Sequence, residues 1–237
     1  MTSPHILVTG ARRGIGAAIA DALEAAGARV VRHASRAGDG LLAADLDRPA
    51  AAPTLWRQAL DALDGRIDVL VNNAGIFEAA VIDLPDEAWV AAWERTLRVN
   101  LTASAELSRL AVRHWLAEGL PGRLVNVASR AAYRGDSPAH WHYAASKAGM
   151  IGMTKSIARG YARDGILAFA VCPGFTMTAM AEDYFSSRGG EGIQADIPLG
   201  RVAQPDEVAE TVRWLALQAP PSSTGSVLDV NGASYVR

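Results

Sequence analysis

The chain has 237 residues, 50% of them hydrophobic, which is enough for a large core and predicts one globular domain. Its 23 basic and 25 acidic residues give a formal net charge of -2, so its charge does not favour binding to nucleic acid or to an anionic membrane. A single cysteine, Cys172, excludes an intrachain disulfide and a cysteine-based metal site, and the sequence begins with neither a basic targeting region nor an apolar span. We therefore expect a cytoplasmic protein that acts on small molecules.

Short apolar runs rich in β-forming residues recur along the chain and alternate with stretches of helical spacing. This alternation predicts an α/β fold with a doubly wound parallel sheet and helices on both faces. The expected strands cover residues 6–8, 28–31, 41–44, 67–71, 123–127, 166–171 and 227–230. Between the first two, Ile15, Ile19 and Leu23 fall at helical steps and Gly27 follows as a stop signal, so this segment predicts a strand–helix–strand unit.

The later connections are of unequal length. Only residues 36–40 separate the second strand from the third, too few for a covering helix, so one helix of the repeating pattern is expected to be missing. Residues 86–119 and 141–160 each predict a long helix whose many small residues permit close packing, including packing between subunits. Residues 177–198 contain a run rich in glycine and serine, which predicts an irregular, mobile segment that covers a substrate.

Three glycines, Gly10, Gly14 and Gly16, mark the place where the first strand ends and the first helix begins. At such a turn the backbone, here including Ile15, can approach a diphosphate at the helix N-terminus. A tight strand-to-helix turn also needs glycine, so the motif alone leaves a purely structural turn as an alternative. In its context between a strand and a helix, the turn predicts a dinucleotide-binding site.

The end of the second strand indicates which dinucleotide is preferred. A site for NAD usually places a carboxylate there to hold the ribose 2'-hydroxyl, whereas this chain reads Arg32-His33-Ala34-Ser35-Arg36. Arg13 in the turn and Arg36 after the strand can instead meet a 2'-phosphate, with Ser35 adding a hydroxyl group. We therefore expect NADP(H) as the preferred cofactor and leave NAD(H) open, with ordinary solvated arginines as the alternative.

A series of motifs resembles the short-chain dehydrogenase/reductase family over nearly the whole chain. The matching segments are Thr9-Gly10 through Gly16, Asp45-Leu46, Asn72-Asn73-Ala74-Gly75, Asn100, Asn126-Val127-Ala128-Ser129, Tyr143 through Lys147, and Pro173-Gly174 with Thr178. The resemblance implies a single Rossmann-like domain with about seven parallel strands, assembled as a homotetramer or homodimer on the two long helices. It also implies NADP, because Ala34 stands where NAD-preferring members carry Asp and Arg13 stands where many NADP-preferring members carry a basic residue.

The resemblance further implies which residues contact the cofactor. It places Asp45 and Leu46 beside the adenine, Asn73, Ala74 and Gly75 along the ribose side, and Pro173, Gly174, Thr176 and Thr178 at the nicotinamide end. Asn73 can equally be a structural tie between strands, because a buried asparagine is often a hydrogen-bonded brace.

The chemistry that the family implies centres on Tyr143 and Lys147, which lie four residues apart and share one face of a helix. Reduction of a ketone needs a hydride on carbon and a proton on the developing alkoxide, so a proton donor must lie beside the oxygen. A free phenol has a pKa of about 10, and the Lys147 ammonium is expected to lower the pKa of Tyr143. Lys147 would also hold the nicotinamide ribose, Ser129 would orient the carbonyl, and Asn100 would hold a water that feeds protons through Lys147.

Each of these residues also has a structural interpretation. In a Tyr-x-x-x-Lys pair the tyrosine can simply pack in the core while the lysine amine is solvated. Ser129 can be a turn residue at a strand end, and Asn100 can be a helix cap or kink. His140 and His142 have a spacing that a metal site uses, but no third ligand is evident. We expect these histidines in a pocket wall or at the surface and assign no metal.

The interpretation that joins these features is an NADP(H)-dependent oxidoreductase that reduces a ketone or oxidises a secondary alcohol of small or medium size. Tyr133, Trp141, Phe175 and Met180 are expected to line an apolar substrate pocket. Phe169 occupies a place where the family often has Asn, and it is not expected to touch the chemistry.

Other functions remain open. The sequence is similar to the 3-oxoacyl carrier-protein reductases, but where these present basic residues at the active-site entrance to an acidic carrier, the comparable positions are Leu120 and Asp164. A nucleotide-binding redox sensor is the alternative of another class, although a sensor without turnover has no need of intact Ser129, Tyr143 and Lys147. A purely structural oligomer predicts no rise in melting temperature with nucleotide.

Overall fold

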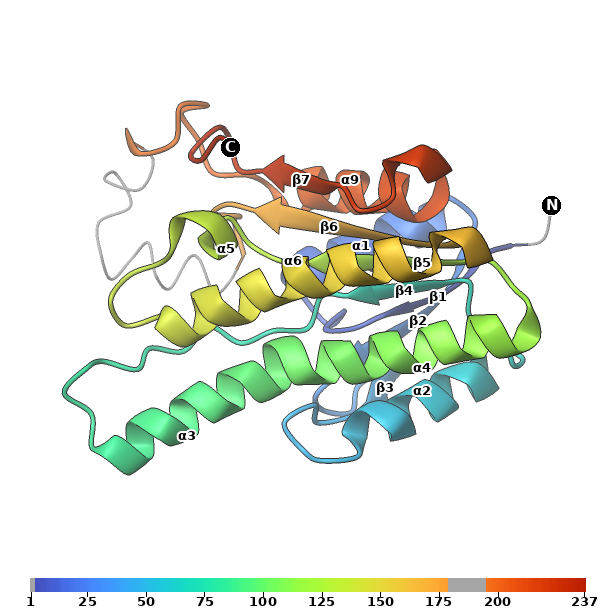
Figure 1. Ribbon diagram of the computed structural model, residues 1–237, viewed down its shortest axis with the longest axis horizontal. Coiled ribbons are helices and arrows are strands. Elements are labelled where there is room, and N and C mark those ends of the chain that lie inside the picture. The colour runs from blue at the N-terminus through green and yellow to red at the C-terminus, as the bar shows by residue number, and fades with distance from the viewer. Residues whose placement is uncertain (1–2, 179–194) are drawn as a thin grey trace.

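The computed structural model describes residues 3–178 and 195–237, and one parallel sheet runs through its centre (Figure 1). Within these residues the seven strands are β1 (His5–Val8), β2 (Arg29–Ala34), β3 (Leu41–Ala43), β4 (Val69–Asn72), β5 (Gly122–Val127), β6 (Ile166–Pro173) and β7 (Val227–Val230). Their order is β3-β2-β1-β4-β5-β6-β7, and each neighbouring pair is parallel. The predicted doubly wound sheet is confirmed, and its order reverses between β1 and β4, the place where such sheets bind ligands.

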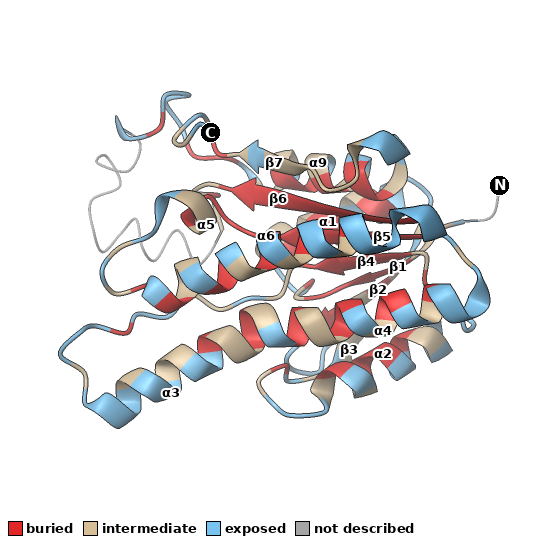
Figure 2. Cartoon of the chain, in the orientation of Figure 1, coloured by how far each residue is buried: buried red, intermediate tan, exposed pale blue. Residues whose placement is uncertain are grey.

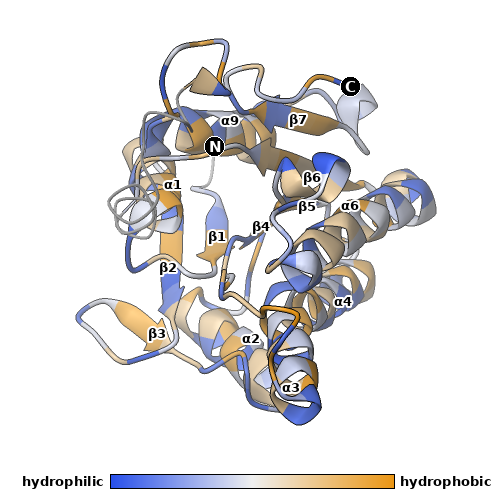
Figure 3. Ribbon diagram, turned by 90° about the vertical axis from the view of Figure 1, so that its left-hand side faces the viewer, coloured by the Kyte–Doolittle hydropathy of each residue, from blue (hydrophilic) through white to orange (hydrophobic). Residues whose placement is uncertain are grey.

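Helices cover both faces of the sheet (Figure 3). One face carries α1 (Gly14–Ala25) and α9 (Pro205–Leu217), and the other carries α2 (Ala51–Ala62), α4 (Ala103–Glu118) and α6 (Trp141–Tyr161). The remaining helical elements include α3 (Asp86–Leu97), the short α5 (Ala131–Arg134) and 3-10 turns at Ala162–Asp164 and Pro221–Ser223. None of the described helices is both long and apolar enough to cross a membrane.

The strand β6 shows why an apolar run forms the centre of this sheet. Every residue of β6 is buried, because helices cover both faces and a parallel strand then needs apolar side chains on both sides. Phe169 packs into the core on the α1 and α9 side, whereas Ala168 packs on the side of α2, α4 and α6. Figure 2 shows the strands as the buried layer between helices that are exposed on their outer faces.

The connection after β2 carries no helix, as the sequence predicts. Residues 35–40 lead directly into β3, which is the edge strand and pairs with β2. The strand β2 extends past its expected end at residue 31, because Arg32 pairs with Leu41 and Ala34 with Ala43. The end of β2 therefore lies beside an open edge of the sheet.

The helix predicted for residues 141–160 is α6, but the one predicted for residues 86–119 is interrupted. The helices α3 and α4 join through a π-helical turn at Arg98–Thr102, which contains the buried Asn100. Such turns place one extra residue in a helix and are frequent at functional sites. Most of residues 177–198, including Met180, lies outside the described residues, so the mobile substrate cover stays a prediction.

Candidate active site

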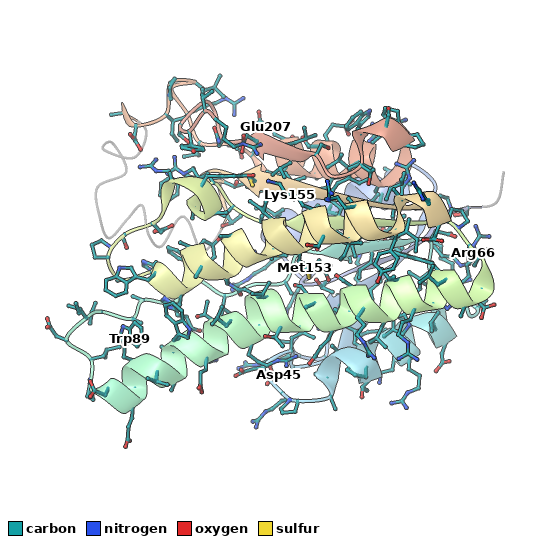
Figure 4. The ribbon with its side chains drawn as sticks, in the orientation of Figure 1. Asp45, Arg66, Trp89, Met153, Lys155 and Glu207 are labelled. Carbon is teal, nitrogen blue, oxygen red and sulfur yellow. The ribbon has the colours of Figure 1, made fainter. Side chains whose placement is uncertain are left out.

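Two adjoining cavities lie along the carboxyl edge of the sheet, with volumes of about 850 Å³ and about 230 Å³. Ile15, Asn73, Gly75 and Thr178 line both cavities. Predicted residues that line only the larger one are Gly10, Arg13, Gly14, Gly16, Ser35, Arg36, Asp45, Leu46 and Ala74, and those that line only the smaller one are Ser129, Tyr143, Lys147, Pro173, Gly174 and Thr176. The structure therefore brings together every predicted site residue except Asn100, which lines neither cavity. Figure 4 labels Asp45, in the loop between β3 and α2.

The glycine-rich turn joins β1 to α1 with a backbone that side chains would block. Gly10 has a φ of 66°, and a Cβ atom on Gly16 would lie 2.1 Å from the Gly10 carbonyl oxygen. Thr9 fixes the turn, because its Oγ1 accepts hydrogen bonds of 3.0 Å from the backbone N–H groups of Asn73 and Ala74. The turn thus has the closely packed backbone of a diphosphate cradle.

Replacing Gly16 with Ala is expected to lower the free energy of unfolding by about 1–3 kcal/mol and to weaken NADPH binding, because the new methyl group overlaps backbone atoms. Gly152→Ala is the matched control, since apart from the neighbouring helix backbone no described atom lies within 4 Å of its Cβ position on α6. Within one subunit, alanine there should preserve or raise stability. Thermal denaturation with and without NADPH checks both variants, and equal behaviour of the two would contradict the close packing of the turn.

Asn73 is both a structural tie and a residue of the cavity wall. Its Nδ2 donates to the carbonyl oxygens of Thr9 at 2.9 Å and Gly10 at 3.1 Å, so it braces β4 against the turn. The same residue lines both cavities. The brace is therefore also part of the wall of the site.

His33 is a candidate functional residue that was not expected from the sequence. It is 2% exposed at the end of β2, where its Nδ1 accepts a hydrogen bond from the Gly10 N–H at 3.2 Å and its Nε2 lies 2.8 Å from the Ala44 carbonyl oxygen. This arrangement requires the neutral ring protonated on Nε2, and burial lowers the pKa of His33 below its ordinary value. His33 thus ties the glycine-rich turn to the loop after β3. The sequence signal that could have found it is its place two residues after the apolar Val31, on the same face of the strand.

Several arginines line the larger cavity. Arg13 and Arg36 are exposed there beside Ser35, together with Arg12, which was not expected from the sequence. Arg32 is held by two carboxylates of α1. The ion pairs among the described residues leave Arg12, Arg13 and Arg36 unpaired, so three guanidinium groups are available to an anion.

Tyr143, Lys147 and Ser129 meet in the smaller cavity. The helix α6 carries the first two one turn apart, and the Lys147 Nζ lies 5.8 Å from the centre of the Tyr143 ring. Ser129 follows β5, and its Oγ accepts a hydrogen bond from the Ala131 N–H at 3.1 Å and also interacts with the Tyr143 phenol. Lys147 is 4% exposed and donates from Nζ to the Val127 carbonyl oxygen at 2.8 Å. A phenol, an ammonium and a hydroxyl group therefore border one small space.

The pKa of Tyr143 differs from the expectation. Burial raises the pKa of the Tyr143 phenol to about 12, although its hydrogen bond with Ser129 acts in the opposite direction. Burial also lowers the pKa of Lys147 to about 8. The expected lowering of the Tyr143 pKa is therefore wrong for the chain on its own, because the cost of removing a phenolate from water exceeds the opposing effect of Ser129.

Asn100 lies behind this group rather than in the cavity wall. Its Oδ1 accepts from the Ile76 N–H at 2.8 Å, and its Nδ2 donates to the Ile76 carbonyl oxygen at 3.1 Å and to the Ser146 Oγ at 3.2 Å. A Cβ atom on Gly75 would lie 3.3 Å from the Asn100 Oδ1 and 3.5 Å from the Lys147 Nζ. The amide and the ammonium therefore border the same space beside Gly75.

The apolar wall of the smaller cavity agrees only in part with the prediction. Phe175 lines it as expected, whereas Tyr133 and Trp141 do not. Trp141 begins α6 and is 49% exposed, because it lies on the outer side of that helix. Phe77, which was not expected, lines the cavity and meets the Tyr143 ring edge to face at 4.8 Å.

His140 and His142 belong to a group of stacked aromatic rings. His140 stacks on Phe77 with 3.9 Å between ring centroids, and His142 lies 6.3 Å from His140. Trp89, labelled on α3 in Figure 4, lies 6.2 Å from the ring of Trp141. No group of three or more metal-ligating side chains occurs within residues 3–178 and 195–237. The contacts give these histidines a packing role beside the cavity.

Known proteins share both the sequence and the architecture. Residues 10–233 match a family model described as enoyl-(acyl carrier protein) reductase. Nodulation protein G of Rhizobium sp. (strain N33) is 37% identical over 244 residues, which cover 98% of this chain and 97% of the relative. The 3-oxoacyl-[acyl-carrier-protein] reductase of Escherichia coli (strain K12) is 35% identical over 244 residues, which cover 97% of this chain and 96% of the relative.

Solved structures agree with these relatives. A proposed 2-deoxy-d-gluconate 3-dehydrogenase from Agrobacterium tumefaciens with bound NADP has a TM-score of 0.89 at 32% identity, covering 100% of this chain and 98% of that one. A proposed NAD(P)-dependent gluconate 5-dehydrogenase from Beutenbergia cavernae with bound NADP has a TM-score of 0.88 at 32% identity, covering 99% and 97%. With the fold, the ordered motifs and these matches in agreement, the chain belongs to the short-chain dehydrogenase/reductase family of oxidoreductases.

Proposed function

We propose that this protein is an NADP(H)-dependent oxidoreductase that reduces a ketone or oxidises a secondary alcohol. The observation that supports this most strongly is the meeting of Ser129, Tyr143 and Lys147 in a small cavity that continues into the glycine-lined one. The joined cavities suit an extended dinucleotide whose nicotinamide end reaches the phenol. Bound NADPH supplies the hydride, and the chain supplies orientation and the proton.

Each of the three residues has a separate task in this proposal. Ser129 donates a hydrogen bond to the substrate carbonyl oxygen and fixes its position. Tyr143, with a pKa of about 12, is fully protonated at neutral pH and transfers its proton to the same oxygen as negative charge develops there. Lys147, with a pKa of about 8, is mainly protonated at pH 7 and stabilises the phenolate that remains.

Asn100 is proposed to help restore the proton. Its Oδ1 and the Lys147 Nζ border the same space beside Gly75. A water molecule held there would connect the ammonium to solvent, so the phenol regains a proton through Lys147. In this proposal Asn100 positions the water and does not touch the substrate.

The larger cavity supports NADP(H) as the preferred cofactor. Arg12, Arg13 and Arg36 border it beside Ser35, where the 2'-phosphate of NADP would find unpaired guanidinium groups. The glycine-rich turn has no room for a Cβ atom at Gly16, so its bare backbone can lie close to a diphosphate. The residues present therefore fit this cofactor, and Asp45 and Leu46 form the wall that would receive the adenine.

Arg13→Ala is expected to lower the NADPH-to-NADH ratio of kcat/KM by about 10-fold or more, because a charged hydrogen bond to the 2'-phosphate is lost. Arg29→Ala is a matched control, since Arg29 pairs with Asp64 at the other end of β2. Steady-state rates with both nucleotides measure the ratio. An unchanged ratio in Arg13→Ala would remove this residue from the phosphate site and leave Arg12 and Arg36 to be tested in the same way.

Reduction of a 3-oxoacyl carrier-protein substrate is the second candidate, and relatives of that name favour it. The sequence comparison predicts Leu120 and Asp164 at the cavity entrance, but these residues lie two positions before β5 and β6. Because the strands are parallel, both lie at the amino edge of the sheet, opposite the carboxyl edge that holds Ser129. The predicted place of Leu120 and Asp164 at the entrance is therefore wrong within a single chain.

NADPH oxidation separates the candidate functions when it is measured with simple ketones and with the N-acetylcysteamine thioester of 3-oxobutanoate, a small mimic of a carrier-bound substrate. Turnover of simple ketones supports the proposal, whereas turnover of the thioester alone favours the carrier-protein reductase. A melting temperature that rises with NADPH without any turnover favours the redox sensor, and the absence of both favours a structural oligomer.

We also propose that the chain forms a homotetramer or homodimer through α4 and α6 in the cytoplasm, where its single thiol stays reduced. Leu116 on α4 is 44% exposed and Trp141 on α6 is 49% exposed, which leaves apolar surface for a second subunit. Size-exclusion chromatography with light scattering measures the number of subunits, and a monomer at micromolar concentration would contradict this part of the proposal.

A further inference from the structure

Arg130 follows Ser129 directly and lines the smaller cavity, yet none of the proposed catalytic steps uses it. Its backbone N–H donates to the Pro173 carbonyl oxygen at 3.0 Å, which fixes the residue between the ends of β5 and β6. The residue is 9% exposed, and its Nη1 is buried without a hydrogen-bond partner among the described residues. Arg130 is thus a buried cation in the cavity wall with an unused donor.

The surroundings of the guanidinium leave its charge poorly compensated. It lies over the Phe175 ring, 4.7 Å from the centroid. The positive charge of Arg134 repels it, and Asp196, which attracts it, forms its own ion pair with Arg134 at 3.0 Å. Phe175 therefore provides stacking, and Asp196 provides an attraction that it shares with Arg134. Neither residue is an anion that pairs with Arg130 alone.

Asp136 lies in the wall of the same cavity but is also occupied elsewhere. Its Oδ1 accepts a hydrogen bond from the Ser137 N–H at 2.7 Å and lies 4.0 Å from the His140 Nδ1. It attracts Arg130 at longer range, yet burial outweighs all these attractions and lowers the pKa of the guanidinium below its usual value. Among the described residues, the cavity wall therefore holds a positive group without a matching anion.

A buried charge without a paired partner is unfavourable unless a ligand compensates it. The planar guanidinium matches a carboxylate particularly well, because two parallel N–H groups can donate to the two carboxylate oxygens. The smaller cavity, with a volume of about 230 Å³, would hold the nicotinamide ring as well, so the ligand that meets Arg130 there must be a small molecule. An acidic substrate would bring the missing negative charge into the site with its carbonyl group.

We propose that Arg130 binds the carboxylate of the substrate, so that the substrates are small oxo acids and the corresponding hydroxy acids. This inference rests on the proposed function, because the carbonyl group must still reach Ser129 and Tyr143. Because Arg130 and Ser129 line the same cavity, one small substrate can present its carbonyl group to Ser129 and its carboxylate to Arg130.

NADPH-dependent reduction of 3-oxobutanoate, 4-oxopentanoate and 5-oxohexanoate, each beside its methyl ester, tests the proposal. The series varies the distance between carbonyl and carboxylate, and each ester removes the charge. We expect kcat/KM for the best acid to exceed that of its ester by about 10-fold or more. An ester reduced as well as its acid throughout the series would overturn the proposal, and this comparison needs no variant.

Variants then locate the effect. Arg130→Met is expected to lower kcat/KM for the acid by about 10- to 100-fold, mainly through KM, and to leave the ester within about threefold. Arg130→Lys should restore part of the loss as a single point charge. Arg213→Met on α9 is the control for the loss of a positive charge, since Arg213 pairs with Glu210 and lines neither cavity. Equal losses for acid and ester, or an equal loss in Arg213→Met, would contradict a carboxylate contact at Arg130.

The same measurements separate this inference from the proposed function. Reduction of the neutral esters without any preference for the acids leaves the oxidoreductase intact and overturns only the role of Arg130. If no acid or ester is turned over while NADPH still raises the melting temperature, the role of Arg130 and the proposed function are both overturned.

Discussion

Tyr143→Phe is expected to lower kcat for ketone reduction by about 10²- to 10⁴-fold, the range that general acid catalysis supplies. The variant loses the phenolic proton and the hydrogen bond with Ser129, but it keeps the ring that packs against Phe77 at 4.8 Å. Binding of NADPH should therefore survive. Rates of NADPH oxidation and the nucleotide-induced rise in melting temperature measure the two effects separately.

Tyr161→Phe is the control for this experiment. Tyr161 ends the same helix, is 36% exposed and lines neither cavity, so loss of its hydroxyl should leave turnover unchanged. If Tyr143→Phe turned over within about threefold of the parent protein, general acid catalysis by this phenol would be excluded.

Lys147→Met is expected to slow turnover by about 10²-fold or more and to raise the melting temperature near neutral pH. Activity falls because the phenolate loses its neighbouring ammonium. Stability rises because Lys147 is 4% exposed and its charge is costly to bury, whereas methionine has a similar shape and no charge. We expect a gain of about 1–2 kcal/mol in the free energy of unfolding, reduced by the lost hydrogen bond to the Val127 carbonyl oxygen.

The pH dependence of this gain has a definite sign. The pKa of Lys147 is about 8 in the folded chain and 10.5 as the reference for the unfolded one. Between these values the unfolded chain holds a proton that the folded chain has released, so the stability of the parent protein rises with pH. The advantage of Lys147→Met should be largest below pH 8 and shrink toward pH 10.5. Thermal denaturation without nucleotide at pH 7 and pH 9.5 measures it, and a constant or growing difference would contradict the burial of a charged lysine.

Local patterns were enough to predict the sheet and much of the site. Apolar runs identified the strands because helices bury both faces of a parallel sheet, as β6 illustrates. The four-residue spacing of Tyr143 and Lys147 placed both on one side of α6 because that spacing is close to one helical turn. The glycines of the turn were identifiable because close backbone contact at Gly16 tolerates no side chain.

Features that depend on distant segments were not predictable in this way. The π turn around Asn100 leaves no mark in the apolar spacing, since it adds one residue inside a continuous helix. His33 acquires its role from Gly10 and Ala44, which fold against it from two other segments. The raised pKa of Tyr143 reflects burial, a property of the assembled site that spacing along one helix does not reveal.

Arg130 is the clearest case of such a residue. In the sequence it is one more arginine after a strand, and arginines are mostly exposed. Its significance comes from the Pro173 carbonyl oxygen that fixes it and from the absence of a partner for its Nη1 among the described residues. Only the packed structure separates it from solvated arginines such as Arg36.

A crystal structure with NADP bound tests the central claim most directly. We predict the nicotinamide ring in the smaller cavity, with its reactive carbon facing the hydroxyl groups of Tyr143 and Ser129 and with space for one carbonyl group between them. The diphosphate should lie against the turn at Gly14–Gly16. A dinucleotide bound elsewhere, or a nicotinamide separated from the Tyr143 hydroxyl by other side chains, would contradict the account.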